Sequence, residues 1–280
     1  MAERRRIGRM IAVDIPQFRG PVHVREDGPA EAPTLLLLHG FSGSMHWFDL
    51  AVPLLADEYR LVRVDLLGHG ATAGRAFDAP VQAAAIEQVL AALDISDATA
   101  VGHSFGADVA VELAERSSRV SRLVIVAQAP DYTDATLPRA AALVGVPVLG
   151  AVLPRLAQGL AAGIVRLRRE RIAREQLLAQ ALADFRALNS AMLRIVLIDR
   201  RDRMAARPLD AQVAASGKPT LVILGERDHF YGARSEPRYR TAGAAVHVLA
   251  DTGHSPFVER PAEVVELLRA FATTIAPEPT

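Results

Sequence analysis

One serine of this chain stands in a five-residue pattern that suits nucleophilic catalysis. Residues 102–106 read Gly-His-Ser-Phe-Gly, which fits G-x-S-x-G with Ser104 at the centre. An apolar run ends at Val101 and a segment of helical period begins near Phe105, so the pattern falls on a predicted strand-to-helix turn. Such a turn exposes the hydroxyl, and the helix N-terminus directs backbone N–H groups toward a developing oxyanion. We therefore predict that Ser104 is a nucleophile rather than part of an ordinary glycine-flanked turn.

A serine needs a base to take its proton at neutral pH, and one of the eight histidines is best placed for this role. His254 lies in a loop between the last predicted strand and the final predicted helix. His103 adjoins the serine, and its side chain is expected to point away from the site. His39 and His69 sit in glycine turns, and His247 lies within a predicted strand. We therefore expect His254 to be the general base.

An imidazole base needs an acid that fixes its tautomer and stabilises its charged form. Asp228 is the first choice, because it lies just past the apolar run 221–224. Glu226 is a poorer alternative, since it is closer to the strand, and Asp251 is more typical of a turn residue. Asp131 follows another predicted strand end and is a further alternative. The predicted order along the chain is therefore serine, aspartate, histidine.

The elements that must position these residues alternate along the chain. Short apolar runs, typical of strands buried on both faces, alternate with longer segments of helical period, which is the pattern of βαβ units. The predicted strands are residues 22–24, 35–38, 61–64, 99–101, 123–127, 221–224 and 245–249. The predicted helices are residues 46–56, 81–93, 105–116 and 262–273. The expected fold class is α/β, with a mostly parallel central sheet flanked by helices.

Residues 131–208 break this alternation. They contain no convincing strand, and apolar residues recur at helical spacing in the second half of the segment. We predict an inserted helical cap between two parts of one core, residues 1–130 and 209–280. The arginine-rich stretch 166–174 is interpreted as a solvated helix face rather than a site for an acidic substrate or carrier protein. The candidate pocket residues are Ser42, Leu178, Leu182, Phe185 and Met192.

These motifs together resemble the α/β-hydrolase superfamily, in the form that carries a helical cap. The resemblance covers nearly the whole chain and includes His-Gly-Phe at 39–41, Asp-Leu-Leu-Gly-His-Gly at 65–70 and Gly-His at 253–254. In relatives, the backbone N–H groups of the residue after His-Gly and of the residue after the nucleophile form the oxyanion hole. The resemblance therefore implies that Phe41 and Phe105 donate here. The 65–70 turn resembles a structural element of the family rather than a catalytic one.

The resemblance implies a serine hydrolase that cleaves a carboxylic ester of a small, largely apolar molecule through an acyl-enzyme on Ser104, without a metal or organic cofactor. Ser104 argues against relatives with an aspartate at this position, such as haloalkane dehalogenases and many epoxide hydrolases. The loop at 39–43 disfavours proline iminopeptidases, whose oxyanion loop is usually richer in glycine and proline. Carbon–carbon bond hydrolases and thioesterases share the serine site and stay open. So do ligand receptors and biosynthetic proteins that keep the fold without hydrolysing.

Composition sets broader limits on function. Half of the 280 residues are hydrophobic and 23% are charged, which is an ordinary globular balance. The formal net charge is zero, so no nucleic-acid partner or anionic membrane is expected. The chain has no cysteine, which excludes disulfides and thiolate chemistry. Residues 1–16 make a poor secretory signal and residues 140–165 a poor membrane span, so a cytoplasmic location is expected; the oligomeric state is not predicted.

Overall fold

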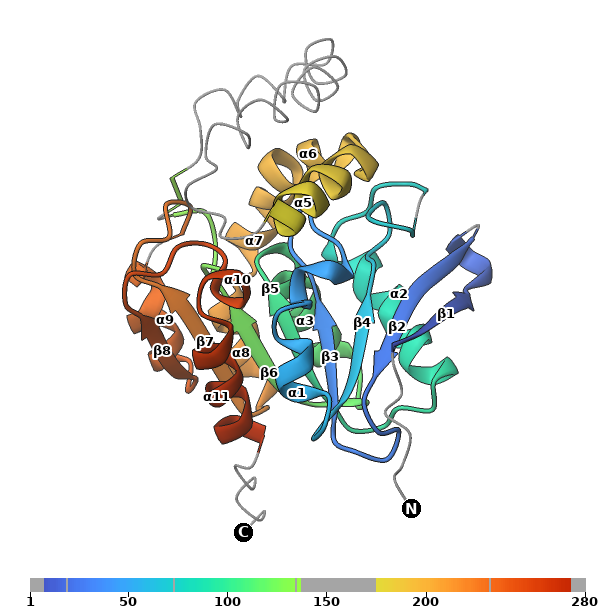
Figure 1. Cartoon of the computed structure of the whole chain (residues 1–280). Helices are drawn as coiled ribbons and strands as arrows, with labels where there is room; N and C mark the ends of the chain where they lie inside the picture. The colour runs from blue at the N-terminus through green and yellow to red at the C-terminus, as the bar shows by residue number, and fades with distance from the viewer. Residues whose placement is uncertain are drawn as a thin grey trace.

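Eight strands form one continuous sheet in the part of the chain that the computed structural model describes. That part comprises residues 8–18, 20–72, 74–133, 135–136, 175–231 and 233–272. In chain order the strands are β1 (Arg9–Asp14), β2 (Pro21–Asp27), β3 (Thr34–Leu38), β4 (Arg60–Val64), β5 (Ala98–His103), β6 (Val120–Val126), β7 (Thr220–Gly225) and β8 (Ala245–Leu249). Across the sheet their order is β1-β2-β4-β3-β5-β6-β7-β8 (Figure 1). β2 is antiparallel to β1 and to β4, whereas all other pairs are parallel, so the predicted α/β architecture is confirmed.

The central strands are apolar on both faces, as their sequences predict. β3 reads Thr-Leu-Leu-Leu-Leu and is buried throughout. Successive side chains of a strand point to opposite faces of the sheet. Leu36 and Leu38 therefore join one core cluster, and Leu35 and Leu37 join the other. The two clusters hold the helices against the two faces of the sheet.

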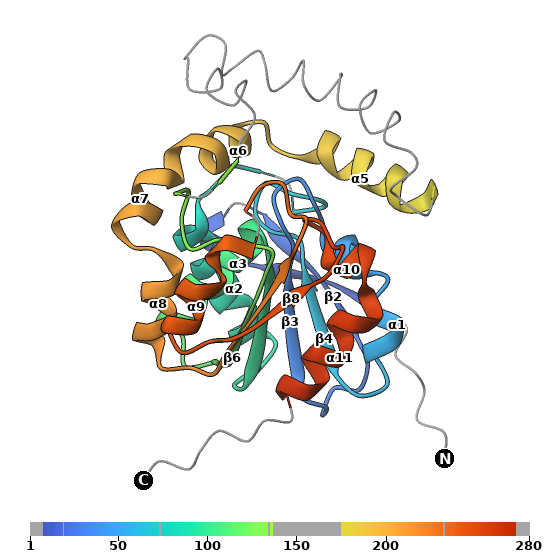
Figure 2. The same ribbon diagram turned by 90° about the vertical axis from the view of Figure 1, so that its left-hand side faces the viewer.

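Helices cover both faces (Figures 1 and 2). The first face packs against α2 (Ala79–Ala92), α3 (Phe105–Arg116), α8 (Leu209–Ser216) and α9 (Glu236–Thr241). The second packs against the 3-10 turn η2 (Met45–Phe48), α1 (Val52–Leu55), α10 (Pro256–Glu259) and α11 (Pro261–Ala272). Two further 3-10 turns are η1 (Pro16–Phe18) and η5 (Ala233–Ser235). Of the helices described, none is long and apolar enough to cross a membrane.

A helical segment lies across one edge of the sheet (Figure 2). It consists of α5 (Glu175–Ala187), α6 (Ala191–Arg194), the π-helix η4 (Ile195–Asp199) and α7 (Arg200–Ala206). Its contacts identify the edge, because α5 reaches Ser44 after β3, and Asn189 donates its backbone N–H to the Gly68 carbonyl after β4. These are the carboxyl ends of parallel strands, where ligand sites of α/β sheets form. Within residues 131–133, 135–136 and 175–208 no strand occurs, while residues 137–174 lie outside the described residues, so the division at 131 and 208 stays a prediction.

Three features differ from the sequence-based expectation. Strand β1 was not predicted, because four of its six residues are exposed and the edge strand lacks a buried apolar run. The helix predicted over residues 46–56 is instead η2 followed by the single turn α1. Pro53 has no N–H to donate to the preceding turn, which prevents one continuous helix here. The short helices α8, α9 and α10 were also not predicted.

Candidate active site

Ser104 occupies the turn between β5 and α3, in a backbone conformation that residues other than glycine rarely adopt. Its φ is 52° and its ψ is −119°. A Cβ atom on Gly102 would lie 2.2 Å from the Gly106 carbonyl oxygen, and one on Gly106 would lie 2.2 Å from the Leu38 carbonyl oxygen. The two glycines therefore permit the close passage of turn, helix and neighbouring strand that this geometry requires. Strain of this kind is found where a site needs a side chain held in one position.

The structure brings together the three residues that were predicted to act as nucleophile, base and acid. Nε2 of His254 lies 3.0 Å from Oγ of Ser104, and Nδ1 lies 2.8 Å from Oδ2 of Asp228. A carboxylate can only accept, so Nδ1–H donates to Asp228 and Nε2 remains to accept from the serine hydroxyl. The three loops follow β5, β7 and β8, which end at the same edge of the sheet. This arrangement can move a proton from Ser104 to His254 while Asp228 stabilises the imidazolium.

Asp228 is held as a carboxylate by several donors. Its side chain is 2% exposed, and Oδ1 accepts the backbone N–H of Phe230 at 2.8 Å. Burial raises the pKa of Asp228, but the hydrogen bonds and charge of His254 and the N–H groups of Phe230 and Tyr231 lower it, and the net pKa is below the ordinary value. Asp228 is therefore ionised at neutral pH and can orient His254.

The alternative acids have partners elsewhere. Glu226 accepts the backbone N–H of Asp251 at 3.0 Å, and Asp251 forms an exposed ion pair with Arg227. Asp131 accepts the backbone N–H of Thr133 at 2.8 Å and pairs with an arginine of α9. These contacts are those of turns and surface ion pairs, and they leave Asp228 as the carboxylate that meets His254.

His103 lies beside the site, so the expectation that its side chain points away needs correction. Its Nε2–H donates to the backbone carbonyl of His254 at 2.7 Å, and its ring stacks on Trp47 at 5.3 Å between centroids. Strand alternation puts His103 on the same face of the sheet as Val101, which is the face where the His254 loop passes. Burial lowers the pKa of His103 to about 3, so the ring is a neutral donor at physiological pH.

The predicted oxyanion donors both lie next to Ser104. Phe105 is the first residue of α3, and the first N–H groups of a helix have no partner inside that helix. Phe41 follows Gly40, at which a Cβ atom would lie 3.1 Å from Cβ of Ser104, so this loop passes directly beside the serine. The backbone N–H groups of both residues can therefore point toward the carbonyl oxygen of an ester that Ser104 attacks.

Buried polar contacts support the loop that carries Phe41. His39 accepts the Leu66 N–H through Nε2 at 3.1 Å, while its Nδ1 lies 2.8 Å from the Gly40 carbonyl oxygen. Asp65 accepts the backbone N–H groups of Met45 at 2.7 Å and Ala71 at 2.8 Å. Asp65 therefore stabilises turns beside the site, in keeping with the structural role that its motif implies.

A cavity of about 760 Å³ opens beside His254 and Asp228. Trp47, Phe230 and Val258 contribute apolar walls, and Phe230 also packs its ring edge-to-face on His254 at 5.0 Å. The remaining lining residues are mostly polar or charged, and they include three residues of α5: Gln180, Ala181 and Asp184. The volume lies within the range of small-molecule pockets.

Of the predicted pocket residues, Ser42, Leu182, Phe185 and Met192 are not among the described residues that line this cavity. Met192 is fully buried in the core cluster, and Phe185 packs against the same cluster. Leu182 is half-buried, and the side chain of Leu178 lies outside the described residues. Ser42 lies in the loop after β3 at a φ of 61°. The periodicity of α5 indicated an apolar face correctly, but that face meets the core, and the neighbouring face meets the cavity.

Ser44, in the loop after β3, binds the helical segment. Its hydroxyl donates to Oδ2 of Asp184 at 2.8 Å, and Gln180 donates to Oδ1 of the same carboxylate at 2.7 Å. Burial raises the pKa of Asp184, and the two hydrogen bonds only partly oppose this effect. The contact ties α5 to η2 above the site.

In the described part of the chain, no group of three or more His, Asp or Glu side chains is arranged to hold a metal ion. The hydrogen-bonded serine, histidine and aspartate can supply acyl-transfer chemistry.

Comparisons with known proteins show which proteins the chain resembles. A sequence profile described as the alpha/beta hydrolase family matches residues 35–267. The chain is 30% identical over 246 residues to the magnesium-chelatase 30 kDa subunit of Rhodobacter capsulatus, covering 81% of this chain and 80% of that protein. It is 28% identical to the pimeloyl-[acyl-carrier protein] methyl ester esterase of Stenotrophomonas maltophilia, covering 90% of this chain and 97% of that protein. The crystal structure of a hydrolase from Pseudomonas aeruginosa PA01 superposes with a TM-score of 0.77 at 26% identity, covering 96% of this chain and 99% of that one.

Proposed function

The chain belongs to the α/β-hydrolase family, and we propose that it cleaves a carboxylic ester of a small, largely apolar molecule through an acyl-enzyme on Ser104. The observation that carries the proposal is the pair of hydrogen-bond distances from His254, 3.0 Å to Ser104 and 2.8 Å to Asp228. Family members with esterase names support an enzyme of this type. The proposed site therefore has its nucleophile, base and acid in one hydrogen-bonded chain.

The proposed reaction runs in two halves. Oγ of Ser104 attacks the ester carbonyl carbon while Nε2 of His254 takes the hydroxyl proton, and the N–H groups of Phe41 and Phe105 stabilise the oxyanion. The intermediate collapses to the acyl-enzyme as the imidazolium returns that proton to the leaving alcohol. Water then attacks the acyl carbon with His254 again as base, which releases the acid and restores Ser104. Asp228 stays ionised throughout and stabilises the imidazolium.

One apolar part of the otherwise polar cavity supports a substrate with an apolar body. Phe230 packs on His254, Trp47 and Val258 also line the cavity, and Gln180 and Asp184 add polar groups from α5. We further propose that residues 131–208 act as a cap that completes the pocket. The methyl ester esterase among the relatives favours an ester over a thioester or a carbon–carbon bond.

The test combines an active-site label with a substrate panel. A fluorophosphonate should label Ser104, and p-nitrophenyl esters should turn over faster than matched acyl thioesters or vinylogous diketones. Preferred cleavage of a thioester or a diketone would replace the proposed substrate class while keeping the serine mechanism. Binding of these compounds without labelling or turnover would contradict the enzymatic proposal.

A further inference from the structure

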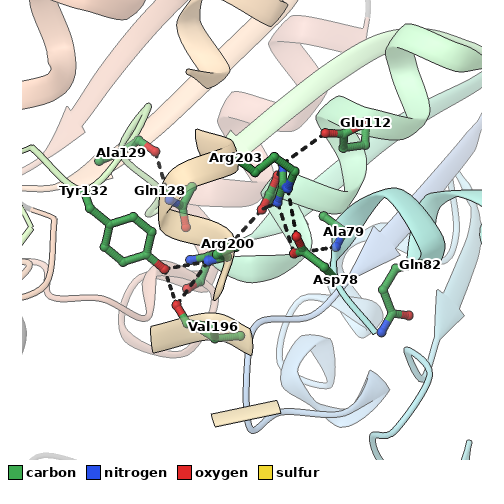
Figure 3. Close-up of polar contacts among 12 residues, drawn as sticks. Asp78, Ala79, Gln82, Glu112, Gln128, Ala129, Tyr132, Val196, Arg200 and Arg203 are labelled. Atoms are coloured by element: carbon green, nitrogen blue, oxygen red, sulfur yellow. Dashed lines mark hydrogen bonds and ion pairs between the residues drawn. The ribbon is translucent and has the colours of Figure 1, made fainter. Parts of the chain in front are cut away.

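A fully buried arginine of the helical segment reaches into the core near the candidate site. Arg200 is the first residue of α7, and its side chain is 0% exposed. Figure 3 shows it beside Tyr132 and Val196, one turn from Arg203. A buried guanidinium needs partners for its donors, since taking a charge out of water is costly.

The three nitrogens of the guanidinium donate in three directions. Nε lies 2.6 Å from the hydroxyl of Tyr132, which follows β6. Nη1 lies 3.2 Å from Oδ2 of Asp108 on α3, and Nη2 lies 3.1 Å from the hydroxyl of Tyr231 in the loop after β7. The planar fork of arginine suits such divergent contacts, whereas a lysine ammonium would reach one of them.

Two contacts of Arg200, with Phe105 and with Tyr231, lead toward the candidate chemistry. The guanidinium carbon lies 5.4 Å from the ring centroid of Phe105, the residue after Ser104. The ring of Tyr231 lies 5.7 Å from that of His254, and its backbone N–H is 3.3 Å from Oδ1 of Asp228. Arg200 therefore contacts a residue next to the nucleophile and a residue of the loop that holds the acid.

The helix before Arg200 is widened in a way that serves this contact. Residues 195–199 form a π-helix, in which the carbonyl of Val196 accepts from the hydroxyl of Tyr132 and from Nε of Arg200 at 3.3 Å. Burial raises the pKa of Tyr132, so its phenol stays protonated and can donate to Val196 while it accepts from Arg200. Short π-helices recur at functional sites because they redirect side chains and carbonyls.

Arg203 is a matched neighbour that lacks these contacts. Its Nη2 lies 2.6 Å from the same Oδ2 of Asp108, and its other nitrogens pair with Asp78 at 2.8 Å and Glu112 at 3.0 Å. Asp108 therefore keeps an arginine partner when either arginine is replaced. Comparing the two positions separates the loss of an ion pair from the loss of contact with Phe105 and Tyr231.

We propose that Arg200 is a positioning residue for the hydrolysis. It holds α3 and the loop of Asp228 in one arrangement, so that the Phe105 N–H and the His254–Asp228 pair stay aligned with Ser104. The helical segment then contributes to the chemistry as well as to the choice of substrate. This inference rests on the proposed function.

The experiment measures the rate at which a small fluorophosphonate modifies Ser104, together with kcat, KM and Tm on a short-chain p-nitrophenyl ester. Arg200→Met and Tyr231→Phe should lower the labelling rate and kcat about ten- to a hundred-fold, with KM changed far less, because small misplacements of reacting groups have effects of this size. Arg200→Lys should not restore the rate. Arg203→Met should lower Tm to a similar degree as Arg200→Met, but its labelling rate should stay near that of the unaltered protein.

Three results would overturn the inference. If Arg200→Met and Tyr231→Phe label at the rate of the unaltered protein, the proposed function stands and the positioning role is wrong. If Arg203→Met slows labelling as much as Arg200→Met, general loosening explains the effect. If the unaltered protein is neither labelled nor hydrolytic, the proposed function is wrong, and the inference that rests on it is wrong as well. Should Arg200→Met not fold, Tyr231→Phe decides alone, because it removes only one hydroxyl and keeps the ring against His254.

Discussion

His254 is held at two points, and the two contacts together orient its ring. Asp228 accepts from Nδ1 at 2.8 Å, and His103 donates to the backbone carbonyl of His254 at 2.7 Å. The first contact selects the tautomer with a free Nε2, and the second holds the loop. The neutral form of His103 is required for the arrangement, because a protonated ring would place a second positive charge 5.1 Å from the His254 ring when that ring becomes imidazolium.

Replacing Ser104 by alanine should abolish the covalent route. We expect kcat for ester hydrolysis to fall about a million-fold, because nucleophile and base act as a unit. His254→Ala should be about as severe for the same reason. Circular dichroism and thermal unfolding should show that both variants keep the fold. A folded Ser104→Ala protein that retains most of its rate would remove Ser104 from the mechanism.

Asp228→Asn keeps the size of the side chain and removes its charge. We expect a loss of about ten-thousand-fold in kcat, since the amide favours the wrong tautomer of His254 and does not stabilise the imidazolium. Glu226→Gln is the matched control, because it changes a carboxylate two residues away that accepts a backbone N–H at the surface. If Asp228→Asn leaves kcat almost unchanged while Glu226→Gln or Asp131→Asn lowers it strongly, the acid is one of those other residues.

Helix α5 presents two different faces to its surroundings. Gln180, Ala181 and Asp184 line the cavity, while Phe185 packs against the core and Met192, after the helix, is buried within it. Ala181 and Phe185 are four residues apart and therefore neighbours on the helix surface, so the cavity-facing and core-facing sets adjoin each other along α5. Substrate preference and stability should therefore respond to different substitutions.

Ala181→Leu should narrow the cavity. We expect the preference among p-nitrophenyl esters to shift toward shorter acyl chains, because each methylene that an apolar pocket accepts or refuses is worth about 1 to 3 kcal/mol. The labelling rate of Ser104 with a small phosphonate should barely change. An unaltered chain-length profile would show that the cavity beside His254 does not hold the acyl group.

Met192→Ala serves as the counterpart in the core. It should lower the free energy of unfolding by about 2 to 5 kcal/mol, since a fully buried side chain leaves a cavity when it is truncated. Denaturant titration measures the change, and the chain-length profile should stay the same. If Met192→Ala shifts the chain-length profile but hardly lowers the free energy of unfolding, Met192 belongs to the substrate pocket.

At the scale of the whole molecule, three neutral histidines are buried around the carboxyl edge of the sheet. Burial lowers the pKa of His39 to about 4 and the pKa values of His69 and His103 to about 3, from 6.5. Below pH 6.5 the unfolded chain binds protons at these rings that the folded protein does not bind. The free energy of unfolding therefore falls as the pH drops from 6.5 toward 4 and 3. His46 acts in the opposite direction, because its hydrogen bond to Asp49 raises its pKa.

We accordingly expect urea titrations to give a lower free energy of unfolding at pH 5 than at pH 7, by on the order of 1 kcal/mol for each of the three rings. His69→Asn should reduce this difference, because the amide can still donate toward the Leu67 carbonyl but does not take up a proton. His247→Asn changes an exposed histidine on β8 and serves as the control. If His69→Asn leaves the pH dependence as it was, that ring is not a neutral buried group in the folded state.

Local patterns determined much of this protein. The unbroken apolar runs predicted parallel strands buried on both faces, and G-x-S-x-G predicted the turn at Ser104, because both depend on backbone geometry and side-chain period over a few residues. Positions just past strand ends also selected Asp228 and His254, since parallel strands end at one edge. These inferences need no knowledge of how distant segments pack.

Only the tertiary structure decided which polar groups meet. Arg200 contacts partners 31, 68 and 92 residues away, and its type and spacing gave no sign of them. The order of the strands likewise decides that His103 meets the His254 loop. The way the helical segment crosses the sheet decides which face of α5 meets the cavity. The period of the hydrophobic residues indicates which side of a helix is buried. The residues that meet its other side depend on packing between elements that are far apart in the chain.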